Sequence, residues 1–149
     1  MTGVQTCALP ICLAQLRDLG RPALLALRGD GGPVTHVLLV GLDDKTALVQ
    51  AGGARRRVSI WVLATVWRGD ALTLWKAPPG WREPLGDSLP RELAAWLDQR
   101  LPGSTEQPLK TRITEFQVTH GLKPDGLAGP MTLMQLNRAT GVEEPSLSR

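Results

Sequence analysis

Apolar and polar residues alternate along most of the first half of the chain. The most regular alternation covers residues 35–42 and predicts a strand with two distinct faces. One face carries His36, Leu38 and Val40, and the other carries Val37, Leu39 and Gly41. Apolar or alternating runs predict further strands at 22–27, 46–50, 55–59 and 71–76. The turns between successive strands are short and rich in glycine and aspartate, which favours antiparallel pairing.

Helical spacing replaces this alternation at residues 13–19, after Ser59 and in the last third of the chain. The first of these helices ends at Gly20, and Ser59 can cap a short helix that carries Leu63, Val66 and Trp67. In the last third, three apolar stripes predict three helices: Leu93, Trp96, Leu97 and Leu101; then Leu109, Ile113, Phe116 and His120; then Leu133 and Leu136. The predicted fold class is α+β, an antiparallel sheet domain followed by a small three-helix bundle.

A stretch rich in proline and glycine separates these two regions. We expect a sheet domain over residues 13–76, a linker over 77–89, a helical domain over 90–141 and a tail over 142–149. A loop of that length inside one compact domain is uncommon, which favours a linker. Trp61, Trp67 and Trp75 are expected in the core of the small sheet, because indole rings bury large apolar areas.

The first residues, MTGVQTCALPI, resemble a translated short-read sequencing adapter. On this interpretation residues 1–12 are an artefact, authentic protein begins near Leu13, and the sheet domain is truncated at its N-terminus. The alternatives are an ordinary N-terminal segment and a signal peptide, but no positive charge precedes the apolar residues. Cys7 and Cys12 are therefore not used as disulfide, metal or nucleophile candidates. A genomic read across codons 1 to 13 tests the interpretation.

Composition and charge narrow the classes of function. A hydrophobic content of 42% indicates a folded protein, and the net charge of +3 is mild. The basic run Arg55-Arg56-Arg57 has no aromatic residues between its members, so a nucleic-acid groove is not expected. No apolar run approaches the roughly 20 residues that span a bilayer. With two histidines, no usable cysteine and no phosphate-loop motif, neither a metal site nor a cofactor is expected, and Asp43-Asp44 is interpreted as turn chemistry.

The helical region carries an ordered motif: Phe116-Gln117, His120-Gly121-Leu122, Pro124-Asp125-Gly126, Gly129-Pro130 and Thr132-Leu133. This pattern resembles the peptidoglycan-binding domain found at the ends of bacterial wall enzymes and envelope proteins. The resemblance implies binding of peptidoglycan through a polar rim formed by Gln117, Asp125, Gly126 and Thr132. Free N–H groups at the start of the last helix would hold a stem-peptide carboxylate. The alternative is that Asp125 only braces its turn and Thr132 only caps its helix.

The sheet region resembles the C-terminal half of a C39-type, papain-like cysteine peptidase. The resemblance places His36 at the position of the general base. The orienting aspartate of that family falls near Gln50, and the cysteine-bearing helix would lie before Leu13. A base without its nucleophile has no activity, so His36 is interpreted as a structural sheet histidine and the chain is not expected to be an enzyme.

Together and in this order, the two resemblances are similar to the periplasmic region of the general secretion pathway protein A family. This implies a periplasmic location, a parent protein anchored in the inner membrane with an ATPase domain, and a role in assembling the type II secretin through the cell wall. The implied partners are peptidoglycan and general secretion pathway protein B. Two alternatives remain: a fragment of a C39-type peptidase or cell-wall hydrolase that lacks its catalytic cysteine helix, and a scaffold domain that binds another protein.

Overall fold

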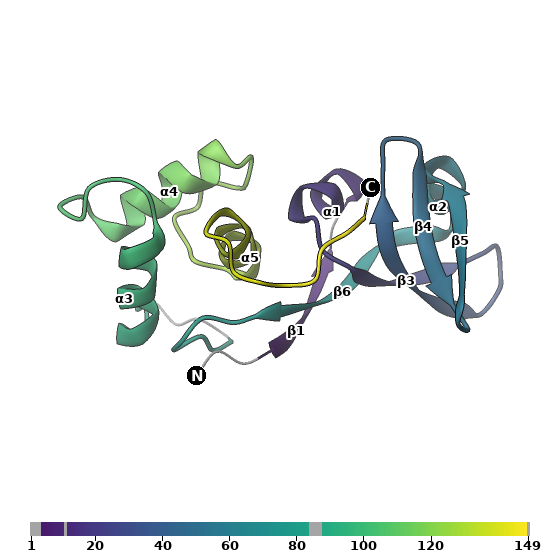
Figure 1. The fold of residues 1–149 in the computed structure, drawn as a ribbon, viewed down its shortest axis with the longest axis horizontal. Helices are drawn as coiled ribbons and strands as arrows, with labels where there is room; N and C mark the ends of the chain where they lie inside the picture. The colour runs from purple at the N-terminus through teal and green to yellow at the C-terminus, as the bar shows by residue number, and fades with distance from the viewer. Residues whose placement is uncertain (1–3, 11, 84–87, 149) are drawn as a thin grey trace. The chain divides into compact units, whose positions relative to one another are not determined.

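The structure is a computed structural model that describes residues 4–10, 12–83 and 88–148, with the backbone alone for 4–10. The chain divides into two compact units. The sheet unit contains residues 6–75 and 144–149, and the helical unit contains residues 76–143 together with the start of the chain. Figure 1 shows the elements of both units along the chain.

The sheet unit is built on strands that follow the order β1-β6-β2-β3-β4-β5 across one sheet. Their bounds are β1 (Val4–Pro10), β2 (Ala23–Arg28), β3 (Val34–Leu42), β4 (Thr46–Ala51), β5 (Ala54–Ser59) and β6 (Trp67–Lys76). Two short helices, α1 (Leu13–Leu19) and α2 (Ile60–Val66), interrupt this series. β2 pairs antiparallel with β3 and β6, and β4 pairs antiparallel with β3 and β5. The predicted α+β class with an antiparallel sheet is confirmed.

The two faces predicted for β3 are also confirmed. Val37, Leu39 and Gly41 are buried, whereas His36 and Leu38 are exposed. The core of the unit also contains buried leucines from α1 and β2, namely Leu16, Leu19 and Leu25. Burial of one face fixes the register, because a shift by one residue would move this whole apolar set into water.

Trp67 and Trp75 are buried as expected, whereas the core position predicted for Trp61 and the start predicted for β6 were wrong. Trp61 is 79% exposed, because it lies on the side of α2 opposite to the buried Leu63, two residues away. Trp67 belongs to β6 rather than to the preceding helix. It pairs with Leu27 of β2, and its indole N–H donates to the Asp70 carbonyl at 2.8 Å. The strand predicted at 71–76 therefore begins four residues earlier and lies beside β2.

Of the residues 142–149 for which a tail is predicted, the described residues 144–148 group with the sheet unit. The Ser148 N–H donates to the Val40 carbonyl at 3.0 Å, and the Leu42 N–H donates to the Ser148 carbonyl at 2.9 Å. Glu144 forms a buried ion pair with Arg21 at 2.7 Å. Gly41 permits this approach, because a Cβ there would lie 2.6 Å from Ser148 Oγ. The chain end is thus held on β3 by backbone pairing and a buried charge pair.

The helical unit consists of α3 (Arg91–Arg100), α4 (Leu109–Thr119) and α5 (Pro130–Ala139). Its core contains most of the residues of the three predicted stripes, namely Leu93, Leu97, Leu101, Ile113, Phe116, Leu133 and Leu136, whereas Trp96, Leu109 and His120 are half-buried. Gly121, at φ 66°, ends α4 as expected, and the Leu122 N–H returns to the Gln117 carbonyl at 2.8 Å. Pro130 occupies the first turn of α5, where its missing N–H costs nothing.

Arg112 of α4 is 1% exposed and completes the end of α3. Its guanidinium donates to the carbonyls of Asp98 and Leu101 at 2.9 and 2.7 Å, to the Pro102 carbonyl at 3.3 Å, and to the Asp98 carboxylate. Carbonyls in the last turn of a helix have no partner within the helix, so this side chain satisfies them while joining two helices.

The first part of the predicted linker, residues 77–83, lies within the helical unit. Ala77 is buried, and Gly80, at φ 78°, lies against the start of α3. A Cβ at Gly80 would lie 2.9 Å from the backbone nitrogen of Leu93. Residues 84–87 of the predicted linker lie outside the described residues.

Candidate functional site

The predicted rim residues lie in and around the loop between α4 and α5, residues 120–129. Gly126 has φ 70° and lies against α4. A Cβ there would be 2.8 Å from Lys110 Cγ and 3.0 Å from Thr114 Oγ1. Only glycine combines this left-handed conformation with such a close approach, so the Pro-Asp-Gly turn lies directly against the preceding helix.

Gln117 holds this loop from the inside. Its side-chain nitrogen, Nε2, lies 3.0 Å from each of three acceptors: Asp125 Oδ1, the Leu127 carbonyl and Thr132 Oγ1. Its oxygen, Oε1, accepts a hydrogen bond from the Gly126 N–H at 2.9 Å. Gln117 is 1% exposed, and Thr132 is also buried. The structure therefore brings all four predicted residues together around one buried amide, which places Gln117 and Thr132 beneath the surface.

Asp125 is the exposed side chain of this group. Its Oδ1 accepts from Gln117 Nε2 and from the Leu127 N–H at 2.9 Å, so this oxygen braces the turn. No donor among the described residues bonds to the other oxygen, Oδ2. The carboxylate therefore has one structural oxygen and one that faces solvent.

Two apolar side chains of this region are exposed: Leu127 of the loop, at 62%, and Val118 of α4, at 64%. Gly129 is the N-cap residue of α5 and has no side chain, so no side-chain cap among the described residues bonds to the N–H groups of Met131 and Thr132. The loop thus combines a carboxylate oxygen, an exposed apolar side chain and N–H donors. Neither Leu127 nor Val118 was predicted; an apolar residue directly after a Pro-Asp-Gly turn is the signal that could have indicated Leu127.

His36 and Gln50 do not form a hydrogen-bonded pair. His36 lies on the exposed face of β3, opposite Ala26 of β2. Gln50 lies opposite Leu38, and its Oε1 accepts from Arg55 Nε at 3.1 Å. The free thiol described in the structure, Cys12, is exposed just before α1, and the side chain of Cys7 lies outside the described residues. Among the described residues, a general base, an orienting group and a nucleophile are thus not brought together in one site.

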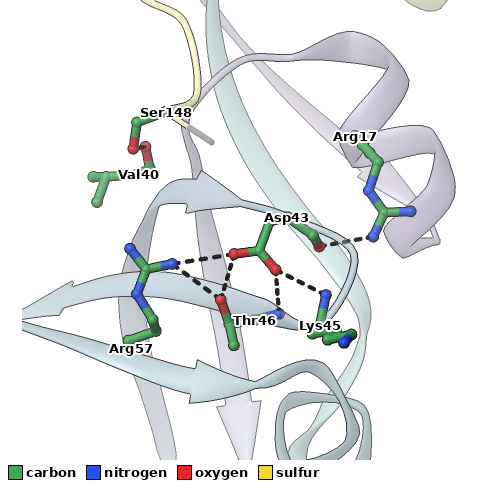
Figure 2. A network of polar contacts seen from close by, with 7 residues as sticks. All are labelled: Arg17, Val40, Asp43, Lys45, Thr46, Arg57 and Ser148. Atoms are coloured by element: carbon green, nitrogen blue, oxygen red, sulfur yellow. Dashed lines mark hydrogen bonds and ion pairs between the residues drawn. The ribbon is translucent and has the colours of Figure 1, made fainter.

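Asp43 organises the turn between β3 and β4 (Figure 2). Its carboxylate accepts from the Thr46 hydroxyl at 2.6 Å and from the N–H groups of Lys45 and Thr46 at 2.8 and 2.7 Å. Arg57 Nη1 lies 3.2 Å from Asp43 Oδ2. The Thr46 hydroxyl bond, the two backbone bonds and the Arg57 charge lower the pKa of Asp43 to about 2. This cluster stabilises a hairpin, in agreement with the interpretation of Asp43-Asp44 as turn chemistry.

Within the described residues, no group of three or more histidine, cysteine or acidic side chains is placed to hold a metal ion. Within the same residues, no helix has the length and apolar character needed to cross a membrane. The interpretation of residues 1–11 as translated adapter can be tested only on the coding DNA. Residues 1–3 and 11, and the side chains of residues 4–10, lie outside the described part of the structure.

Comparison with known proteins gives sequence relatives over most of the chain. The chain is 32% identical over 145 residues to general secretion pathway protein A of Aeromonas hydrophila, which covers 91% of this chain and 26% of the relative. It is homologous to about a quarter of general secretion pathway protein A. It is also 33% identical over 139 residues to a putative general secretion pathway protein A of Escherichia coli K12, covering 87% of this chain and 28% of that protein. No model of a known protein family matches the chain.

The fold also has a solved counterpart. The crystal structure of a periplasmic domain of the EpsAB fusion protein from the Vibrio vulnificus type II secretion system matches with a TM-score of 0.54. The match covers 99% of this chain and 79% of that domain, at 22% sequence identity. The recognition of general secretion pathway protein A from the sequence motifs is confirmed by the named relatives.

Proposed function

We propose that this chain is a non-catalytic, periplasmic part of a type II secretion accessory protein, and that its helical unit binds peptidoglycan to support secretin assembly through the cell wall. Homology to general secretion pathway protein A and the fold of the EpsAB periplasmic domain support the secretion role and the location. The name of that fusion protein supports a B protein as the partner. Because the chain spans about a quarter of the length of its named relatives, these roles of the whole protein are part of the proposal.

The observation that carries the wall-binding proposal is the convergence of the motif residues on one loop. Peptidoglycan combines sugars with short peptides that bear carboxylates, amides and amines. Asp125 Oδ2 would accept a hydrogen bond from a peptide N–H or amine, and the N–H groups at the start of α5 would hold a carboxylate. The exposed Leu127 would contact an apolar face of the ligand.

The four motif residues have different roles in this proposal. Asp125 contacts the ligand directly, and Thr132 contributes its backbone N–H at the start of α5. Gln117 and Gly126 position the loop, because the Gln117 side chain bonds to Gly126, Leu127 and Thr132 and because Gly126 lets the turn lie on α4. A preorganised loop loses less conformational entropy when the ligand binds.

The non-catalytic part of the proposal rests on the surroundings of His36. The Gln50 amide oxygen accepts from Arg55, and no hydrogen bond among the described residues joins Gln50 to His36. In a fragment of an active C39-type peptidase, restoring an upstream cysteine helix from the parent protein would restore cleavage of a peptide substrate. We expect no cleavage by that extended protein.

The direct test is co-sedimentation of the full chain with purified peptidoglycan sacculi. We expect the wild-type chain in the pellet. The double variant Asp125→Ala with Thr132→Ala should remain in the supernatant, because it removes the ligand-facing carboxylate and the buried hydroxyl that bonds to Gln117, although the backbone N–H groups of α5 are kept. Asp125→Asn should weaken binding about tenfold, since it removes the charge while Oδ1 can still accept the Gln117 and Leu127 bonds. Glu106→Ala removes an exposed carboxylate elsewhere in the helical unit and serves as the matched control.

Circular dichroism spectra and thermal unfolding of each variant must show that the helical unit remains folded. A wild-type chain that stays in the supernatant would refute the wall-binding proposal and favour the scaffold alternative. Equal binding by Asp125→Asn and wild type would exclude Asp125 as a ligand contact.

A further inference from the structure

The free edge of the sheet unit has features that wall binding does not explain. β5 is the last strand of the sheet, and its sequence ARRRVS places three consecutive arginines along that edge. Beside it, an open hollow of about 310 Å³ is lined by Val37, Val49, Ala51, Ala54, Arg56 and Val58. We propose that this edge binds an extended acidic segment of a partner protein, which pairs with β5 as an added strand. The inference is independent of peptidoglycan binding.

The outer edge of β5 offers a regular row of backbone N–H and C=O groups that pair with no other strand among the described residues. Ala51 and Ala54 close a two-residue turn made by Gly52 and Gly53, both at positive φ. They therefore form a hydrogen-bonded pair, and so do Val49 with Arg56 and Ala47 with Val58. The intervening residues, Arg55 and Arg57, direct their N–H and C=O groups away from β4. An extended peptide can pair with these groups, as in other cases of strand addition.

The three arginines are not equivalent. Arg55 is bonded to Gln50, and Arg57 is bonded to Asp43 and Thr46. Arg56 is exposed and has no hydrogen-bond or ion-pair partner among the described residues. It also lines the hollow, on the opposite face of β5 from its two neighbours. Arg56 is therefore an unpaired cation next to an apolar surface, which selects a carboxylate flanked by apolar side chains.

This charge pattern also selects against other occupants. Arginines on an edge strand repel a second copy of the same edge, which protects the protein from pairing with itself. An acidic segment converts this repulsion into attraction and so gains selectivity. The hollow lies on β3, β4 and β5, and all of its lining residues except Arg56 are alanine or valine, which suits leucine or valine better than a sugar or a phosphate headgroup.

The test uses the full chain and a synthetic peptide, Thr-Thr-Leu-Thr-Glu-Thr-Leu-Thr-Thr, in which glutamate and both leucines share one face of a strand. Nuclear magnetic resonance titration gives its affinity, and amide hydrogen exchange locates it. We expect slower exchange at the Arg55 and Arg57 amides, with little change at Arg56, whose amide already faces β4. A peptide with lysine in place of glutamate should bind about tenfold more weakly, the effect of one lost charge-assisted contact.

Two controls make the test specific. Arg56→Glu should reverse the preference, so that the lysine peptide binds better, whereas Arg28→Glu, at an exposed arginine of β2, should leave the preference unchanged. A peptide with N-methyl groups on the amides that face β5 should lose binding, because strand pairing needs those N–H groups. The proposal is overturned by unchanged exchange at Arg55 and Arg57, by equal affinity for the two charged peptides, or by binding of anionic lipid vesicles in place of the peptide.

Discussion

Replacement of Gln117 by alanine tests the internal framework of the candidate wall-binding loop. Gln117 is nearly fully buried and makes four contacts, to Asp125, Gly126, Leu127 and Thr132. Its removal leaves the buried Gly126 N–H without an acceptor, which costs about 1–3 kcal/mol. Each further lost hydrogen bond costs about 0.5–1.5 kcal/mol, partly recovered by water at the exposed Asp125. We therefore expect a destabilisation of the helical unit of about 3 kcal/mol.

Amide hydrogen exchange measures this effect in the helical unit by itself, whereas a melting curve of the full chain combines both units. The buried amides of α4 and α5 report the free energy of opening, and the Gly126 amide reports the lost bond directly. For a unit of this size, about 3 kcal/mol corresponds to a fall in melting temperature of about 12–24 °C. The exposed Gln107 provides the control, since Gln107→Ala should change stability by less than about 0.5 kcal/mol.

A destabilisation by Gln117→Ala below about 0.5 kcal/mol, with normal protection of the Gly126 amide, would refute this reasoning. It would mean that the loop is held by backbone geometry and not by the buried amide. The candidate site would then need a different explanation for the convergence of Asp125 and Thr132.

Two other predictions concern a buried and an exposed charge. Arg112→Ala should destabilise the helical unit by about 2–4 kcal/mol, because the carbonyls of Asp98, Leu101 and Pro102 lose their donor. Denaturant unfolding measures this loss of stability. Arg112→Lys should not restore the stability, since one ammonium group cannot reach all three carbonyls. The pKa of Asp43 is lowered from 3.8 to about 2 on folding. The ionised carboxylate therefore contributes fully to the free energy of unfolding above pH about 4, and this contribution is lost as the pH falls through about 2. When the free energy of unfolding is measured across this pH range, Asp43→Asn should therefore lose less stability than the wild type. An equal dependence of stability on pH in the two proteins would contradict the lowered pKa of Asp43.

The candidate site was partly predictable from sequence because its determinants are local. Gly121 ends a helix through its own backbone freedom, Pro130 starts one, and Asp125 bonds within its own turn. Such effects act over a few residues and leave a pattern that can be read along the chain. The exposure of Leu127 is different, since it depends on which surfaces the other helices cover.

The buried position of Gln117 and Thr132 also required the structure. A glutamine or threonine beside a turn is equally compatible with a free polar rim and with an internal bond. Which of the two occurs depends on the distance between α4 and the start of α5, a property of helix packing. Arg112 likewise lies on the buried side of α4, where a charged residue is tolerated because α3 presents its terminal carbonyls.

The sequence alone determined the existence of strands β2 to β6 and of the five helices, the antiparallel class of the sheet, the two faces of β3 and the motif around Asp125. These follow from the period of the apolar residues and from turn chemistry, which act between near neighbours. Only the tertiary structure decided that β6 lies beside β2, that Ser148 pairs with β3, and that Gln117 is an internal support. These arrangements join residues far apart in the chain, and they are selected by which distant surfaces can be buried together.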